Sequence, residues 1–226
     1  MSRIRTVFAA AALALGATSA AEAATYTVRD NPNNGGSVFA TGLSRNINIV
    51  YNGQNRRVGA GAFDLQYGSD ADGYTDFLTF CLQLHETLSL PKEHERVADF
   101  VYFDEPDRTA VSILYNNFMT SALGLANATS AAATQAIVWE IAEDGADNFN
   151  LGAGDFQLLT NSVLTTANLF WDTIVTGQFQ TSSVNVFAAA GTQDLIVTET
   201  PIPAALPLIL SGIAGLRLSA RRRKTA

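Results

Sequence analysis

The sequence predicts an α+β fold, in which a β-rich barrel or sandwich carries an inserted layer of helices. Three observations support this prediction. Short stretches rich in β-branched and aromatic residues, separated by turn residues, fill the first part of the chain. Apolar residues then recur at helical spacing through the middle. Two further strand-like stretches follow, and strands, then helices, then strands favour separate layers over a parallel α/β sheet.

The predicted strands are bounded by turn signals, of which Asn52-Gly53 is typical of a two-residue hairpin. The longest predicted strand is Thr75–Leu90. Successive side chains of a strand point to opposite faces, so Cys81 shares a face with Thr79 and Gln83. The other predicted strands are Thr25–Arg29, Ser37–Thr41, Asn46–Tyr51, Val58–Gln66, Val184–Ala189 and Leu195–Glu199.

Ser130 is the predicted N-cap of a helix that follows a linker at Ala126–Thr129. Within that helix Gln135 lies on the same stripe as the apolar residues Val138 and Ala142. A buried carboxamide costs roughly 1–3 kcal/mol when it lacks a hydrogen-bonding partner, so the burial of Gln135 needs a reason. The predicted amphipathic helices are Arg108–Leu123, Ala131–Ala142 and Ser162–Ile174.

Charge and composition exclude several classes of function. Residues 24–200 hold 7 Lys and Arg against 20 Asp and Glu, a net charge of −13, which disfavours binding to nucleic acid. The single cysteine, Cys81, excludes an intrachain disulfide and a cysteine-rich zinc site. Only two histidines are present, so we expect no metal centre and no cofactor. Asp144, Asp147 and Asp155 lack the spacing of a calcium-binding loop and are interpreted as a solvated acidic loop.

Residues 1–23 have the three parts of a secretory signal peptide. These are a positively charged start, a short apolar stretch at 7–15 and the small-residue motif Ala21-Glu22-Ala23. We therefore expect cleavage between Ala23 and Ala24, and an exported mature chain. The alternative is a short N-terminal helix.

Residues 201–226 predict a sorting tail. Pro201, Pro203 and Pro207 introduce an apolar run that ends at Leu216, shorter than the roughly 20 residues of a comfortable membrane span. We expect this run to cross as a transmembrane helix, with the terminal basic cluster in the cytoplasm and the body of the protein outside. The basic cluster consists of Arg217, Arg221, Arg222, Arg223 and Lys224.

The combination of a proline motif, a short apolar helix and a basic end resembles the PEP-CTERM class of sorting tails, and most closely its VPLPA variant. The resemblance implies that an exosortase-type transpeptidase is a partner. It also implies a tail held in the inner membrane before processing, and a protein at the cell surface or outside the cell afterwards. The tail departs from the pattern at Arg217, which falls inside the usual apolar run. The alternative is an ordinary tail anchor.

Two short motifs resemble the thioester domains of bacterial surface proteins: Phe80-Cys81-Leu82, and Thr134-Gln135 followed by Trp139. In that family a cysteine sulfur and a glutamine carbonyl form an internal thioester and release ammonia. The resemblance therefore implies a bond between Cys81 and Gln135, with Thr134 and Trp139 as supporting residues, in a domain spanning residues 24–200. The match departs from the family's TQxA-type motif at Ile137, where the family has alanine.

A thioester is an activated acyl group, so an amine or hydroxyl that attacks it becomes joined to the protein and frees the thiol. The expected function is single-turnover covalent capture of an unidentified surface or matrix nucleophile, for adhesion or matrix attachment, and not enzymatic turnover. His85 is a candidate to help the thiol ionise, because it shares the predicted strand face of Cys81. At a rise of ~3.3 Å per residue it lies about 13 Å away, so direct contact requires a bulge.

Two other interpretations stay open. In the first, the chain is a non-covalent structural component of a biofilm or envelope matrix, and Cys81 and Gln135 are simply packed residues. In the second, Cys81 and His94 form a hydrolase dyad. Asn127-Ala128-Thr129 also matches a glycosylation acceptor, which is a short and common pattern.

Overall fold

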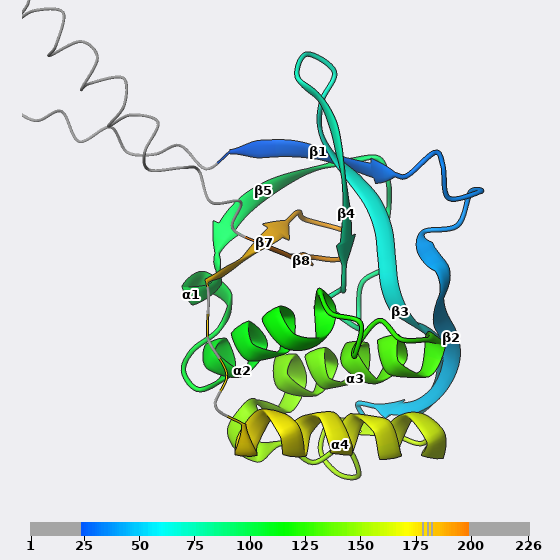
Figure 1. Cartoon of the computed structure of the whole chain (residues 1–226), viewed down its shortest axis with the longest axis vertical. Coiled ribbons are helices and arrows are strands. Elements are labelled where there is room, and N and C mark those ends of the chain that lie inside the picture. Colours follow the sequence, from blue (N-terminus) through cyan, green and yellow to red (C-terminus); the bar gives the residue numbers. More distant parts are fainter. Residues whose placement is uncertain (1–23, 178, 180, 182, 199–226) are drawn as a thin grey trace, which may run out of the picture.

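The computed structural model describes residues 24–177, 179, 181 and 183–198. The predicted signal peptide and sorting tail lie outside these residues. Strands and helices occupy separate parts of the molecule, with a curved sheet on one side and a stack of helices on the other (Figure 1). This is the α+β arrangement that the order of the elements predicts. No helix in the described part of the chain is long and apolar enough to cross a membrane.

In this part of the chain, one antiparallel sheet contains the strands β1 (Thr25–Asp30), β2 (Phe39–Tyr51), β3 (Gln54–Ser69), β4 (Gly73–Thr79), β5 (Lys92–Ala98), β6 (Phe156–Leu158), β7 (Val184–Ala188) and β8 (Leu195–Thr198). Their order is β6-β2-β3-β1-β5-β7-β8, and β4 pairs with β3 off this path. The long strand β3 organises the sheet, because β2 pairs with its first half whereas β1 and β4 pair with its second half.

The helices are α1 (Asp99–Tyr102), α2 (Asp107–Leu114), α3 (Ala128–Asp144) and α4 (Asn161–Thr176). A π-helical turn, η1 (Tyr115–Met119), extends α2, and a 3-10 turn, η2 (Ala146–Asn148), follows α3. Helix α3 packs against α4 and against strands β2 and β3. All its side chains from Ser130 to Ile141 are buried. Long polar side chains in such a helix need partners, and α3 carries two of them, Gln135 and Glu140.

The predicted strand Thr75–Leu90 is wrong beyond Thr79, where β4 ends. The chain then turns toward β8, and Cys81 forms an isolated antiparallel bridge with Leu195. Residues 82–91 form a loop. Apolar residues of this loop pack against the core, which is why its composition resembled that of a strand; they include Leu84, Leu88 and Leu90.

The remaining strand predictions differ mainly in length. The stretches Ser37–Thr41 and Asn46–Tyr51 belong to the single strand β2, whose register shifts between Phe39 and Ser44. The hairpin at Asn52-Gly53 is confirmed, since both residues have the positive φ values (49° and 72°) that a type I′ turn requires. Strands β5 and β6 were not predicted. The β5 sequence is mostly charged and β6 is very short, so neither carries an apolar alternation.

Helix α3 begins earlier than predicted. Its N-cap is Asn127, whose Oδ1 accepts hydrogen bonds from the backbone N–H groups of Thr129 (2.8 Å) and Ser130 (3.1 Å). The prediction of Ser130 as the cap, after a linker at Ala126–Thr129, is therefore wrong. Asn127 is also the acceptor residue of the glycosylation motif, so its side chain already makes hydrogen bonds within the fold.

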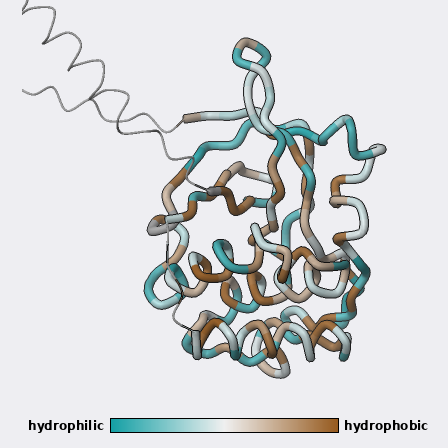
Figure 2. The backbone as a smooth tube through the Cα atoms, in the orientation of Figure 1, coloured by the Kyte–Doolittle hydropathy of each residue, from teal (hydrophilic) through white to brown (hydrophobic). Residues whose placement is uncertain are grey.

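The core lies where the helices meet the sheet. Hydrophobic segments run along the helices and along β7 and β8 in Figure 2, whereas the hairpin at the top is largely hydrophilic. The largest fully buried side chains include Trp139, Phe80, Phe118 and Phe156. Phe80 directly precedes Cys81 in the chain, and Trp139 follows Gln135 by one helical turn.

Candidate functional site

Cys81 and Gln135 are in contact, as their resemblance to a thioester pair implies. Cys81 follows the end of β4 and Gln135 lies in the middle of α3. The cysteine Sγ is 3.6 Å from the glutamine Oε1. Each residue is only 1% exposed. The fold thus brings a thiol and a carboxamide from distant parts of the chain together, away from water.

The carboxamide of Gln135 makes two further hydrogen bonds to the Cys81 backbone. The Cys81 N–H donates to Oε1 at 3.2 Å, and Nε2 donates to the Cys81 carbonyl oxygen at 2.8 Å. A backbone N–H can only donate and a carbonyl can only accept, so these two contacts fix which end of the amide is oxygen. The carbonyl group of Gln135 therefore faces the cysteine, and its oxygen is already polarised by a donor.

The backbone on both sides of Cys81 is held by β8 and by Asp194, the residue that precedes it. Ile196 N–H donates to the Phe80 carbonyl at 3.1 Å, and Leu82 N–H donates to the Asp194 carbonyl at 2.9 Å. Cys81 itself is the residue between these two bonds, so its own N–H and C=O point to the other edge. There they meet Gln135. The cysteine is thus fixed between a strand and a buried helix, which are rigid supports for a reaction that needs precise placement.

Burial raises the pKa of the Cys81 thiol to about 12. The indole of Trp139 and the cysteine's own backbone act in the opposite direction and lower this pKa. The indole Nε1 of Trp139 has no hydrogen-bond partner among the described residues. At neutral pH the thiol is therefore protonated, and nothing charged in the described part of the chain assists its ionisation.

Among the other predicted supporting residues, Thr134 has a structural role. Its side chain is fully buried, and its hydroxyl donates to the Ser130 carbonyl one turn earlier in α3, at 3.2 Å. Trp139 lies one helical turn after Gln135 and packs edge-on against Phe156. Ile137, the departure from the family motif, is about 200° around the helix from Gln135, so its larger side chain does not crowd the carboxamide.

The predicted position of His85 on the strand face of Cys81 is wrong. The strand ends before this residue, and His85 lies exposed in the loop that follows. It lines a pocket together with Glu143, at the end of α3. Burial raises the pKa of the Glu143 carboxyl, and His85 opposes that rise. No hydrogen bond joins His85 to Cys81 in the described part of the chain. His85 is therefore not assigned a role in ionising the thiol.

Cys81 and His94 are not placed to form a hydrolase dyad. His94 is fully buried on β5, with Nδ1 3.1 Å from the Lys92 carbonyl oxygen. Its Nε2 has no hydrogen-bond partner among the described residues. Neither ring nitrogen therefore contacts the sulfur of Cys81.

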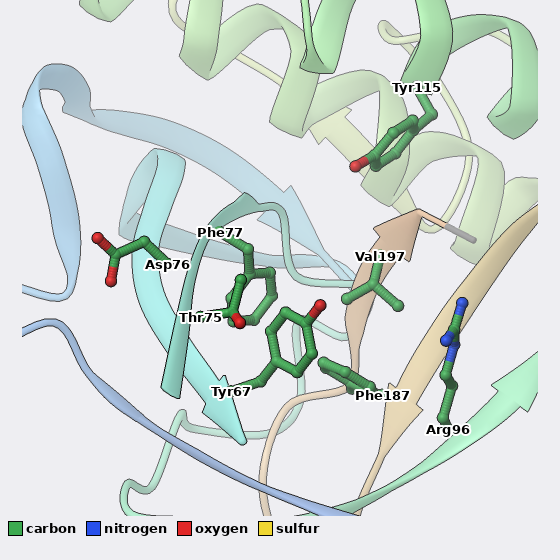
Figure 3. A pocket seen from close by; sticks show the side chains of 8 residues that line it. All are labelled: Tyr67, Thr75, Asp76, Phe77, Arg96, Tyr115, Phe187 and Val197. Atoms are coloured by element: carbon green, nitrogen blue, oxygen red, sulfur yellow. The ribbon is translucent and has the colours of Figure 1, made fainter. Parts of the chain in front are cut away.

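Two pockets have linings that include residues close to Cys81 in sequence, although neither lining includes Cys81 itself. The first has a volume of about 190 Å³. Aromatic rings of Tyr67, Phe77 and Phe187 form one wall, and Tyr115 reaches toward them from the helical layer (Figure 3). The second pocket is more polar and has a volume of about 220 Å³. It is lined by Leu82, Gln83, His85, Tyr102, Phe103, Asp107, Ile141, Ala142 and Glu143.

Asp194 anchors the wall of this polar pocket, a role that no pattern in the sequence indicates. Its Oδ2 accepts hydrogen bonds from Gln83 Nε2 (2.6 Å) and from the Tyr102 hydroxyl. Its Oδ1 accepts the Ala189 N–H at 2.9 Å, and its own N–H donates to Gln83 Oε1 at 2.8 Å. Since Leu82 also bonds to its carbonyl, Asp194 ties the loop after Cys81 to β7 and β8.

The predicted acidic loop is partly structural. Both carboxylate oxygens of Asp144 accept backbone N–H groups, from Asp155 and from Phe156, at 2.9 Å each. No group of acidic, histidine or cysteine side chains in the described ranges has the arrangement of a metal site. Glu140, earlier on α3, accepts the Asn150 N–H at 2.6 Å. Burial raises the pKa of Glu140 to about 7.

No family model matches the chain, and no curated protein matches it. Among solved structures, the chain is similar to the N-terminal thioester domain of a surface protein from Clostridium perfringens. The two share 11% sequence identity with a TM-score of 0.44, over 78% of this chain and 99% of that one.

Proposed function

We propose that Cys81 and Gln135 form an internal thioester, and that the protein uses it at the cell surface to capture an amine or hydroxyl target covalently. The observation that carries the proposal is the contact between the two side chains. The Gln135 carbonyl faces the Cys81 sulfur, with Oε1 3.6 Å from Sγ and hydrogen-bonded to the Cys81 N–H.

This geometry supports the following route to the bond. The sulfur of Cys81 attacks the side-chain carbonyl carbon of Gln135, the C–S bond forms and the C–N bond breaks. The thiol proton leaves with the nitrogen as ammonia. The Cys81 N–H stabilises the negative charge that develops on the carbonyl oxygen, in the manner of an oxyanion-hole donor. The leaving nitrogen is held by the Cys81 carbonyl oxygen, 2.8 Å away.

Capture of the target breaks the bond between Cys81 and Gln135 again, with the target as the new nucleophile. An amine or hydroxyl of the target attacks the thioester carbon, an amide or ester forms, and the C–S bond breaks. The proton lost by the nucleophile restores the thiol. Because the original carboxamide is not regenerated, each molecule acts once, and we do not class the protein as an enzyme.

Burial supports this chemistry. Both residues are almost inaccessible to solvent, which keeps water from hydrolysing the activated bond. Export to the surface is supported by the signal-peptide pattern of residues 1–23 and by the sorting-tail pattern of residues 201–226, with an exosortase-type transpeptidase as the proposed partner. The proposed target is a surface or matrix nucleophile.

One observation also fits a structural matrix protein that binds its surroundings non-covalently. The two hydrogen bonds to Cys81 satisfy both ends of the Gln135 amide, and a fully paired buried carboxamide is stable without further reaction. In that case Cys81 and Gln135 contribute only to packing. The two functions differ in the covalent state of the purified protein.

Intact-mass measurement of the full chain distinguishes them. A thioester lowers the mass by one ammonia, and methylamine then adds to that species and exposes one thiol. The Cys81→Ala and Gln135→Ala variants are expected to show neither change. An unmodified mass in the freshly purified wild type, with no methylamine adduct, would refute covalent capture and leave the structural role.

A further inference from the structure

Trp139 carries a polar group that the fold leaves unused. The side chain is 2% exposed, and its indole Nε1 has no hydrogen-bond partner in the described part of the chain. Buried N–H groups are almost always paired, so each unpaired one calls for an explanation. The ring itself is well packed, edge-on against Phe156, but packing alone does not account for an unpaired N–H.

The position of Trp139 relates this group to the reacting atoms. Residues four apart on a helix are neighbours on one face, so Trp139 lies directly above Gln135 on α3. Gln135 contacts the Cys81 thiol, with Oε1 3.6 Å from Sγ, so this face of α3 is turned toward the sulfur. The Trp139 side chain also lowers the pKa of that thiol, against the rise that burial causes. No charged side chain in the described ranges does so; the other favourable contribution is the cysteine's own backbone.

We propose that the indole N–H of Trp139 is the hydrogen-bond donor that stabilises the anionic sulfur of Cys81. This role rests on the thioester proposed above, because the sulfur carries negative charge at two points of that chemistry. It does so when the thiol gives up its proton to attack the Gln135 carbonyl, and again when the target displaces it from the thioester. In both steps the indole keeps its proton; protons pass only between sulfur and the leaving or attacking group.

The physical basis is preorganisation. A donor fixed in a buried site needs no reorientation when charge develops, and a low-dielectric environment strengthens its interaction with that charge. A neutral thiol is a weak acceptor, which explains why the N–H is unpaired in the resting protein. The contact is expected to shorten into a hydrogen bond when the sulfur becomes negative.

The test compares the full chain with its Trp139→Phe variant, which keeps an aromatic ring and removes the N–H. The matched control is Trp171→Phe, since Trp171 lies on α4 and stacks on Phe149 instead. We expect methylamine to release the Cys81 thiol about tenfold more slowly in Trp139→Phe, the effect of one pKa unit in the leaving group, and at the wild-type rate in Trp171→Phe. Equal rates in all three proteins would overturn the proposal.

A second measurement does not require a thioester. In a Gln135→Ala background, the rate of Cys81 alkylation by iodoacetamide at fixed pH follows the fraction of thiolate. Adding Trp139→Phe is expected to lower that rate about tenfold, again one pKa unit. No change would overturn the role of Trp139. If the wild type has no thioester but Trp139→Phe still slows alkylation in the Gln135→Ala background, the proposed function is refuted. The role of Trp139 as a hydrogen-bond donor to the sulfur is then still supported.

Loss of folding in Trp139→Phe does not end the test. In the Trp171→Phe chain, the remaining tryptophan is replaced by 3-benzothienylalanine, which has the shape of indole with sulfur in place of the N–H. The same slowing of thiol release and of alkylation is expected. Wild-type rates in this isosteric protein would overturn the proposal.

Discussion

Gln135 takes the place of a neighbouring strand for Cys81. Its carboxamide accepts the Cys81 N–H and donates to the Cys81 carbonyl, which is the exchange that paired residues of antiparallel strands make. On the opposite edge, the residue before Cys81 bonds to Ile196 of β8 and the residue after it bonds to Asp194, which precedes β8. A side chain of α3 therefore completes the hydrogen bonding of the chain where β4 has ended, so Gln135 matters for stability as well as for chemistry.

Replacing Gln135 by alanine in a Cys81→Ala background, where no thioester forms and the carboxamide stays intact, is expected to lower the free energy of unfolding by about 1–3 kcal/mol, because the buried N–H and C=O of residue 81 lose their partners. Urea unfolding of the Cys81→Ala protein and of the double variant measures this difference. The exposed Gln54, in the β2–β3 hairpin, supplies the control: Gln54→Ala is expected to change stability by less than about 0.5 kcal/mol. Equal effects of the two substitutions would show that the Gln135 contact contributes nothing to stability.

Asp194 is expected to control access to the thiol. Asp194→Ala removes the acceptor of Gln83, Tyr102 and the Ala189 N–H together, which frees the loop that follows Cys81. Alkylation of Cys81 by iodoacetamide should therefore become faster at a fixed pH, and the unfolding free energy should fall by about 1–3 kcal/mol. Asp172→Ala, on the exposed face of α4, is the matched control and should leave both quantities unchanged. Slower or unaltered labelling in Asp194→Ala would contradict this role.

The sequence predicts the elements of the site better than its boundaries. Residue spacing put Gln135 on a buried helix face, and motif resemblance paired it with Cys81, because both signals depend on local patterns. The end of β4 and the position of His85 were not predictable in this way. They depend on β8, more than a hundred residues away, whose backbone draws Cys81 out of the β3 ladder.

The role of Asp194 was not predictable from the sequence for the same reason. It sits in a short connection between β7 and β8, and nothing in its neighbours marks it. Its importance comes from Gln83 and Tyr102, which only the folded chain brings to it. The cap of α3 is different, because its signal was local and was assigned to the wrong residue. Asn and Ser are both good N-caps, and their ranking alone does not select Asn127 over Ser130.

Asn127 is expected to stabilise the helix that holds Gln135. Asn127→Ala leaves the N–H groups of Thr129 and Ser130 without an acceptor and should lower the unfolding free energy by about 1 kcal/mol, whereas Asn127→Asp should retain most of the stability. Thermal or urea unfolding measures both variants. Asn161 is the exposed first residue of α4, one position after the N-cap Thr160, so Asn161→Ala serves as the control and should be nearly neutral. A neutral Asn127→Ala would mean that the cap is not used in solution.

Glu140 is expected to make stability depend on pH near neutrality. Burial raises its folded-state pKa to about 7 from an ordinary value of 4.5. Between these values the folded protein holds a proton that the unfolded chain has lost, so stability contributed by the protonated carboxyl is complete below about 4.5 and is lost as pH rises through about 7. Above about pH 7 the contribution of Glu140 to stability no longer changes with pH.

Glu140→Gln isolates this effect, because the amide oxygen still accepts the Asn150 N–H while the titration disappears. The variant should therefore gain stability relative to the wild type as pH rises from 5 to 7, as measured by urea unfolding at each pH, and the difference should level off above. Other titrating groups are common to both proteins and cancel in the comparison. The exposed Glu93 of β5 gives the control, Glu93→Gln. If the stability curves of wild type and Glu140→Gln ran parallel across this range, the buried carboxyl would not titrate there, and its unpaired Oε2 would require another explanation.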